Sequence, residues 1–218
     1  MPCRLRPAEL SDVPALAALY ASAFEDNAAY ASIFQLRSFD PQRHAQALAW
    51  LFTKRVSLTS KAGATYLVIQ EEQHGAEQPR VLAAGALLRI SSQPTLWDMV
   101  MEGLLEWPFR WGLPSLFRAL ALDGELLDVP SGGVAPLAQL QMVAVAPGAQ
   151  GEGVGSELVS ALLESWDRRG GGGVVLSTQR ARNLAFYQRR GFVLTKESDQ
   201  DGYTSWALRR DAQVAAPA

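Results

Sequence analysis

The feature that most constrains the fold is a glycine-rich turn at residues 150–155 (QGEGVG), between a predicted strand and a predicted helix. The strand covers residues 137–145 (LAQLQMVAV) and ends before Pro147-Gly148. The helix covers about residues 153–169 and carries its large apolar side chains on one face, as a helix packed on a sheet does. A strand, a tight turn and a helix in this order predict an α/β or α+β layout around one sheet.

The same turn is expected to bind an anion. The first N–H groups of a helix have no partner within the helix, and the helix dipole adds about half a positive charge there. Glycines let the backbone approach a ligand closely, so the amides of residues 151 and 153–156 suit a phosphate or pyrophosphate. A P-loop needs a Lys-Ser/Thr pair where Ser156-Glu157 stands, and the spacing is also poor for a dinucleotide fingerprint. A turn that only caps the helix remains the alternative.

The rest of the pattern predicts one domain over residues 1–211 and a disordered tail at 212–218. Around the central turn, further strands are expected at residues 3–6, 64–70, 81–90, 174–177, 192–194 and 203–208. Helices are expected at about residues 11–24, 41–58 and 181–190, with a Trp- and Leu-rich helical insertion at about 94–123. The fold class is therefore α/β (α+β), with one mixed sheet.

Composition excludes several classes of function. The formal net charge is -2, which argues against a nucleic-acid partner bound through bulk positive charge. One cysteine rules out an internal disulfide framework, and one cysteine with two histidines makes no convincing metal site. The sequence shows no signal peptide and no apolar run of about 18 residues, so we expect a cytoplasmic protein with no membrane partner.

Three linked segments resemble the GCN5-related N-acetyltransferase (GNAT) superfamily: residues 140–147 (LQMVAVAP), 150–155 (QGEGVG) and 183–192 (NLAFYQRRGF). The resemblance is tight over about residues 137–195 and weak or absent elsewhere. It implies a single GNAT domain with a mostly antiparallel sheet flanked by helices, and acetyl-CoA as the cosubstrate with no metal. The overall arrangement is also loosely similar to puromycin-type N-acetyltransferases, which suggests a small amine as the acceptor.

The resemblance also implies roles for individual residues. The turn would wrap the pyrophosphate through Gln150, Gly151, Gly153, Val154, Gly155 and Ser156. The strand would splay from its neighbour and pair its backbone with the pantetheine arm through Met142, Val143 and Val145, with one amide polarising the thioester carbonyl. Tyr187 would protonate the leaving thiolate, and the other cofactor contacts would be Asn183, Phe186 and Arg189, or Arg190 in place of Arg189.

Each role has a structural alternative. Asn183 would serve equally as a helix cap, and Tyr187 as a core aromatic. Glu152 departs from the family pattern, where a basic residue is usual, and its carboxylate beside a pyrophosphate is unfavourable unless it faces solvent.

The acceptor half is less well defined. We expect direct transfer of an acetyl group to a primary amine of a small molecule; the alternatives are a non-catalytic acyl-CoA-binding regulatory module and a protein or peptide N-acetyltransferase. No general base stands out: Glu25 and Asp26 read as solvated loop carboxylates, and His44 and His74 as surface residues. The insertion at 94–123 has three interpretations, namely core packing, a lid or wall of the acceptor pocket, and a dimer surface. Many relatives dimerise, which favours a homodimer.

Overall fold

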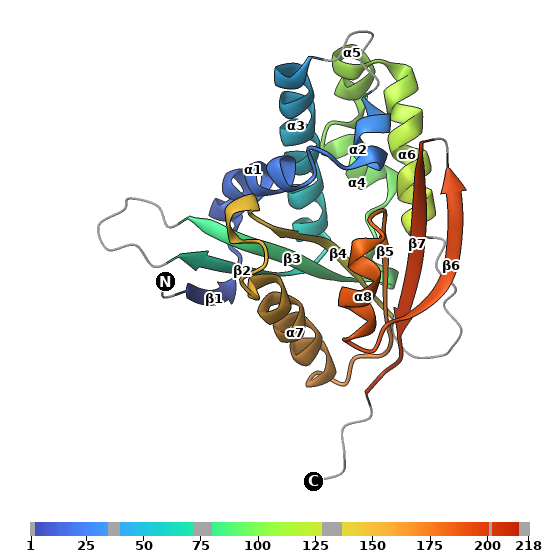
Figure 1. Ribbon diagram of the computed structural model, residues 1–218. Helices are drawn as coiled ribbons and strands as arrows, with labels where there is room; N and C mark the ends of the chain where they lie inside the picture. The colour runs from blue at the N-terminus through green and yellow to red at the C-terminus, as the bar shows by residue number, and fades with distance from the viewer. Residues whose placement is uncertain (1–2, 35–39, 72–79, 128–136, 201, 214–218) are drawn as a thin grey trace.

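A seven-stranded sheet runs through the molecule in the order β1-β2-β3-β4-β5-β7-β6 (Figure 1). This computed structural model describes residues 3–34, 40–71, 80–127, 137–200 and 202–213. The strands are β1 (Cys3–Pro7), β2 (Thr65–Glu71), β3 (Val81–Arg89), β4 (Ala138–Val145), β5 (Val174–Thr178), β6 (Val193–Gln200) and β7 (Tyr203–Arg210). Neighbouring strands are antiparallel except for the parallel pair β4 and β5. The prediction of a mixed, mostly antiparallel sheet is confirmed.

Helices cover both faces of the sheet (Figure 1). On one face lie α1 (Val13–Ala23), α2 (Ala28–Ile33) and α3 (Pro41–Lys61), together with the insertion, which forms α4 (Leu96–Met101), α5 (Trp107–Trp111) and α6 (Leu113–Leu127). On the other face lies α7 (Val154–Asp167), and α8 (Arg182–Gln188) follows β5. Pro108 and Pro114 stand in the first turns of α5 and α6, where a missing N–H costs nothing.

The sheet separates two apolar clusters. On the α1 and α3 side, the rings of Tyr20 and Phe52 are buried with their centroids 5.6 Å apart. On the α7 side, Leu158 and Leu162 pack with Phe192, and all three side chains are almost fully buried. The two clusters are what an α-β-α arrangement of layers requires.

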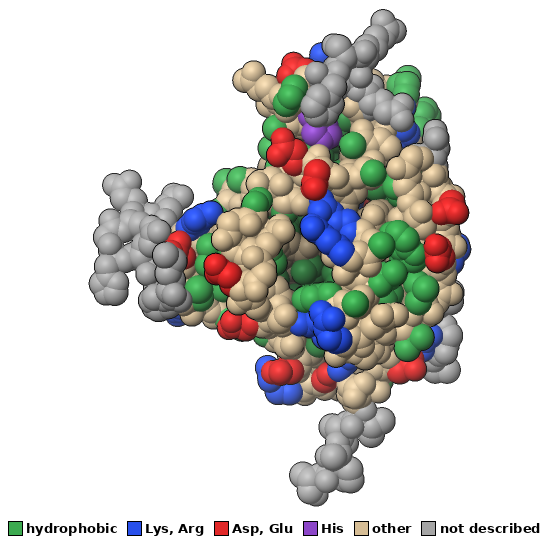
Figure 2. Space-filling model, viewed as in Figure 1, with side chains coloured by type: hydrophobic (Ala, Val, Ile, Leu, Met, Phe, Trp, Pro, Cys, Tyr) green, Lys and Arg blue, Asp and Glu red, His purple; other side chains and the backbone are tan. Residues whose placement is uncertain are grey.

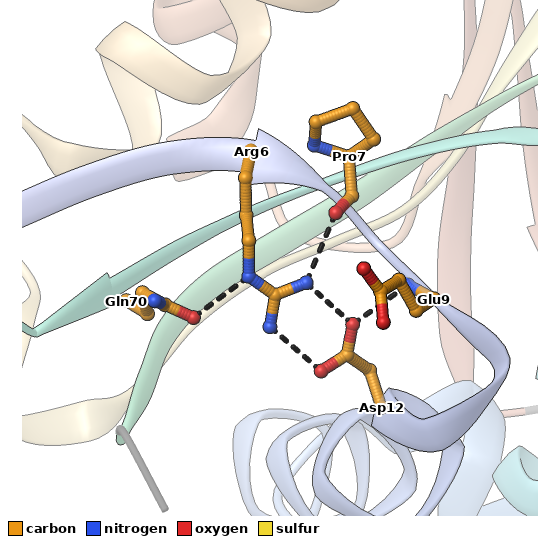
Figure 3. A network of polar contacts seen from close by, with 5 residues as sticks. All are labelled: Arg6, Pro7, Glu9, Asp12 and Gln70. Atoms are coloured by element: carbon orange, nitrogen blue, oxygen red, sulfur yellow. Dashed lines mark hydrogen bonds and ion pairs between the residues drawn. The ribbon is translucent and has the colours of Figure 1, made fainter.

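The first strand is tied to the start of α1 by a polar network (Figure 3). Arg6 donates to the two carboxylate oxygens of Asp12 at 2.6 and 2.7 Å, and its Nε donates to Gln70 Oε1 on β2 at 2.8 Å. Asp12 also accepts from the backbone N–H of Glu9 at 2.7 Å. The hydrogen bonds from Arg6 lower the pKa of the Asp12 carboxyl.

The aromatic residues of the insertion divide into two groups. Trp107 is buried, stacks with Phe34 at a centroid distance of 5.9 Å, and donates from Nε1 to Ser115 Oγ at 2.6 Å. Phe109 and Trp97 are 93% and 69% exposed. Core packing therefore describes Trp107 and not the other two. Within the described ranges, no helix is both long enough and apolar enough to span a bilayer.

β4 and β5 separate after a very short contact. They pair only at Ala138 with Val174 and at Gln139 with Val175. β4 then follows β3 through an irregular register near Ala84, where Met142 has a positive φ of 49°, while β5 follows β7. The splay implied by the resemblance is present, and it opens the centre of the sheet.

Candidate active site

A cavity of about 370 Å³ lies where β4 leaves β5. Its wall comes from β4, the glycine-rich turn, α8 and the end of α1. Figure 2 shows a hollow in this face with basic side chains on its rim. The cavity brings together ten of the residues predicted from the sequence: Val143, Val145, Gln150, Gly151, Gly153, Gly155, Ser156, Asn183, Phe186 and Tyr187.

The turn has the backbone that the sequence predicts. Gly151 and Gly153 have φ values of 87° and 84°, in the left-handed region that favours glycine. α7 begins at Val154, so the open end of the helix faces the cavity wall. A Cβ on Gly155 would lie 2.9 Å from Val145 Cγ2, and only glycine leaves that approach open. Glu152 is exposed and does not line the cavity, so its carboxylate is not part of the wall.

Three predicted residues fall outside this wall. Val154 is buried and packs in the α7 core cluster. Met142 lines a second, smaller cavity instead. Arg189 is exposed at the far end of α8 and lines neither cavity.

Asn183 is positioned by β5. Its Nδ2 donates to Thr178 Oγ1 at 3.0 Å. The N-cap of α8 is Ala181, with no side-chain cap, so the interpretation of Asn183 as the cap is wrong. The hydrogen bond instead holds the first turn of α8 against the end of β5.

Tyr187 is a buried aromatic residue that also lines the cavity. Its ring packs edge-on against Phe186 and Phe192 at centroid distances of 5.1 and 5.8 Å, and the residue is 7% exposed. It nevertheless lines both cavities. Burial raises the pKa of its phenol to about 12, so the hydroxyl stays protonated at neutral pH and can donate a proton.

Two arginines of the wall were missed by the sequence analysis. Arg180 and Arg182 line the cavity just before and at the start of α8, whereas we looked for basic residues at its other end. Arg190 is used differently: its guanidinium lies 3.7 Å from the Phe186 ring centroid and donates to the Phe186 carbonyl oxygen at 2.6 Å. Their place between a predicted strand and a short predicted helix is the sequence signal that could have found Arg180 and Arg182.

Arg180 also joins two segments far apart in the sequence. Its guanidinium donates to the carboxylate of Asp26, which lies between α1 and α2, and this bond lowers the pKa of Asp26. Asp26 is thus an exposed carboxylate with a partner. Phe24, at the end of α1, lines the same cavity and was not predicted.

The second cavity measures about 80 Å³ and shares Phe24, Val143, Arg180, Asn183 and Tyr187 with the first. Its remaining wall is rich in carboxamides, from Asn27, Gln139, Gln141 and Gln179. The insertion at 94–123 contributes nothing to either cavity. The expectation that it forms a lid or pocket wall is therefore wrong for these two cavities.

The histidines take no part in the described site. His44 is 3% exposed in α3 and donates from Nε2 to the carbonyl oxygen of Glu25 at 3.3 Å, so the expectation of a surface residue is wrong. His74 lies outside the described residues. In the parts of the chain that the structure describes, no cluster of His, Cys, Asp and Glu suits a metal ion.

Comparisons with known proteins match one domain and one fold. A model of the acetyltransferase (GNAT) domain matches residues 120–194. Among solved structures, the histone acetyltransferase HPA2-related protein of Corynebacterium glutamicum is 18% identical with a TM-score of 0.67, over 100% of both chains. The yncA protein of Salmonella typhimurium, solved with acetyl-CoA, is 19% identical with a TM-score of 0.53, over 99% of this chain and 96% of its own. The ribosomal-protein-S18-alanine N-acetyltransferase of Escherichia coli is 14% identical with a TM-score of 0.54, over 99% of this chain and 97% of its own.

The matched segment contains all of β4, the glycine-rich turn and α8, which form the cavity wall together with the end of α1. The likeness to the solved structures concerns the fold and extends over the whole chain. The chain therefore contains a segment that matches the GNAT acetyltransferase domain, and it has the fold of solved acetyltransferases.

Proposed function

We propose that this protein transfers the acetyl group of acetyl-CoA directly to the primary amine of a small molecule. The nitrogen of the amine attacks the thioester carbonyl, a C–N bond forms and the C–S bond breaks. The thiolate takes a proton from Tyr187, and the proton that the amine loses returns to Tyr187 through water. The products are an N-acetylated amine and CoA with a free thiol.

The observation that carries this proposal is the position of Tyr187 on both cavities. A donor substrate in the larger cavity and an acceptor in the smaller one would meet beside its phenol. The raised pKa of the phenol keeps it protonated, which a general acid requires.

The larger cavity fits the donor. A Cβ at Gly151 or Gly153 would meet nothing within 4 Å, which leaves room for a phosphate at the start of α7, and Arg180 and Arg182 add positive charge to the wall. The backbone of β4 beyond Gln139 has no strand paired on its β5 side among the described strands, so it is open to hydrogen bonds from the pantetheine arm. An amide near Val143 or Val145 would then polarise the thioester carbonyl.

The acceptor identity is tested by a screen. Purified protein is incubated with acetyl-CoA and a panel of small primary amines, short peptides with a free N-terminus, and lysine-containing proteins, and CoA thiol release is measured. The proposal expects transfer to small amines. Transfer to peptides or proteins alone would replace it with peptide or protein N-acetylation; the Escherichia coli structural neighbour is named as a ribosomal-protein-S18-alanine N-acetyltransferase.

A non-catalytic acyl-CoA-binding module is the second candidate. It would bind acetyl-CoA, as measured by calorimetry, and release no thiol with any acceptor. The shared position of Asn183 and Tyr187 on the cavity wall favours the enzyme, since binding alone needs no phenol there.

A homodimer is part of the proposal. The insertion exposes several large apolar side chains, among them Trp97, Met101, Leu105, Phe109 and Phe117, and such surfaces often mark protein interfaces. Sedimentation velocity of the wild type and of Phe109→Glu tests this. A monomeric wild type would reject the dimer and leave the proposed chemistry intact.

A further inference from the structure

We infer that the acceptor amine carries a carboxylate, and that the smaller cavity recognises it through Arg55 and Arg180. This inference rests on the proposed function, because it concerns the acceptor of the same transfer. It narrows the acceptor from small amines in general to amines with an anionic group, such as α-amino acids.

The position of the smaller cavity suits an acceptor. Tyr187, Asn183 and Val143 line it and also line the larger cavity. A molecule in the smaller cavity therefore lies against the residues proposed to surround the thioester. The smaller cavity has a volume of about 80 Å³ and admits only a small headgroup.

The charge of the wall selects the headgroup. Arg55 from α3 and Arg180 from the segment before α8 are its two charged residues, and the described lining contains no Asp, Glu, Lys or His. The other polar groups are neutral carboxamides and hydroxyls. A wall with two guanidinium groups attracts a carboxylate and repels a second ammonium group, so a diamine is a poor acceptor.

Arg55 has donors to spare. Its Nη1 donates to Asp123 Oδ1 at 2.5 Å, and Asp123 lines another cavity, which Arg55 also borders, and not this one. Its Nε is buried with no hydrogen-bond partner among the described residues. An unpartnered buried donor is unfavourable, and a ligand carboxylate is the acceptor that a guanidinium binds best.

Arg180 supplies the second contact. It borders both cavities, and its one side-chain hydrogen bond in the described structure goes to Asp26. The other N–H groups of its planar fork can bind a carboxylate in the cavity. Two guanidinium groups beside the acceptor also favour the neutral form of its amine, which is the form that attacks.

The test compares matched acceptors. We would measure kcat/KM for L-alanine and L-alaninamide, and for L-serine and L-serinamide, with cadaverine as the diamine. The carboxylate-to-amide ratio is kcat/KM for the amino acid divided by kcat/KM for its amide. This ratio is compared between protein variants at one pH, so the different amine pKa values of acid and amide cancel. The wild type is expected to acetylate the amino acids and to acetylate cadaverine poorly.

The variant Arg55→Met/Asp123→Leu removes the ion pair as a whole and leaves no buried charge unpaired. We expect its carboxylate-to-amide ratio to fall about tenfold or more. The control Lys61→Met/Glu102→Leu removes another ion pair of an α3 residue, in which Lys61 Nζ and Glu102 Oε2 are 2.5 Å apart. Neither residue lines the smaller cavity, so the carboxylate-to-amide ratio of this control should equal that of the wild type.

A second variant guards against a folding defect. In the variant Arg180→Gln, the carboxylate-to-amide ratio is also expected to fall about tenfold. Any change in acetyl-CoA affinity affects both acceptors equally and therefore cancels in this ratio. Ratios unchanged in both variants, or a wild type that acetylates neutral amines and no amino acid, would overturn the inference while the proposed function stands. A wild type that binds acetyl-CoA and acetylates no amine would overturn both.

Discussion

The side chain of Asn183 donates a hydrogen bond to Thr178 Oγ1, 3.0 Å away, and so joins the first turn of α8 to the end of β5. This contact orients Asn183 on the cavity wall. We predict that Thr178→Val raises the Kd for acetyl-CoA about threefold to tenfold, because one side-chain hydrogen bond of this kind contributes about 1 kcal/mol. Isothermal titration calorimetry measures the change.

The matched control is Thr204→Val on β7, where the threonine hydroxyl donates to Asp199 at 2.8 Å and neither residue lines the cavity. Its Kd should equal that of the wild type. Equal Kd values for the two variants would show that Thr178 does not position the donor site.

Tyr187→Phe is expected to lower kcat about 100-fold, within the usual range for loss of a general acid, and to leave the Kd for acetyl-CoA nearly unchanged. Because burial raises the pKa of this phenol to about 12, the wild-type rate should show no loss from Tyr187 ionisation up to about pH 10. Steady-state rates across pH, with calorimetric Kd values, check both statements. A Tyr187→Phe enzyme with wild-type kcat would remove the acid role.

Tyr20→Phe makes the same substitution as Tyr187→Phe at a tyrosine that does not line the cavity. The Tyr20 side chain is fully buried, and its hydroxyl has no hydrogen-bond partner among the described residues. Since an unsatisfied buried hydroxyl costs about 1 kcal/mol or more, its removal should leave the free energy of unfolding unchanged or raise it by about 1 kcal/mol. Urea unfolding measures this, and kcat should stay at the wild-type value. A clear loss of stability would reveal a partner for the hydroxyl.

Gly155→Ala tests the close approach of α7 to β4. The new Cβ would meet Val145 Cγ2 at 2.9 Å and push this side chain along the cavity wall, so we expect acetyl-CoA to bind about tenfold more weakly. Val145→Ala in the same chain removes the clashing methyl and should restore most of the affinity. Gly124→Ala on α6, where nothing lies within 4 Å of the new atom, should leave affinity unchanged.

Lack of rescue by Val145→Ala would mean that the glycine is needed for a different reason, such as direct contact of its backbone with the donor.

Asp12→Asn is expected to lower the free energy of unfolding by about 1–2 kcal/mol at pH 7, because it disrupts the paired hydrogen bonds with Arg6. The native pKa of Asp12 lies below its unfolded value of about 3.9, so this stabilisation is present above that pH and is lost as the pH falls through the native pKa. Urea unfolding at pH 7 and pH 3 should therefore show a smaller difference between wild type and variant at pH 3.

Asp211→Asn is the control, because Asp211 pairs with Arg209 at an exposed site and should contribute little. An Asp12→Asn difference that stays constant with pH would contradict the role given to the carboxylate.

The last third of the chain was predicted well because local signals agree there. The strand before the turn, the glycine-rich turn and the helix after it are specified by apolar periodicity and by glycines, and α7 spans Val154–Asp167 where about 153–169 was expected. Ten site residues from these elements and α8 share one cavity wall. Val154 fell outside it because sequence spacing does not show which face of the first helical turn points inward.

The proposed acceptor cavity was not predicted from the sequence because it depends on contacts between distant segments. Arg55 on α3 and Gln139 on β4 meet Arg180 only once the sheet is assembled, and nothing local marks them. The same holds for His44, which reads as a surface residue in its helix until the carbonyl oxygen of Glu25 is brought to it.

The early separation of β4 from β5 has a consequence for the dynamics of the molecule. A sheet normally has unpaired backbone N–H and C=O groups only at its outer strands. Here β4 and β5, in the middle of the sheet, are joined through only two described residue pairs, Ala138 with Val174 and Gln139 with Val175. The interior of the sheet thus behaves as a second pair of edges. Amide hydrogen exchange without ligand should be fast near Val143 as well as at the periphery, and a ligand that docks along β4 would act as a temporary eighth strand and slow it.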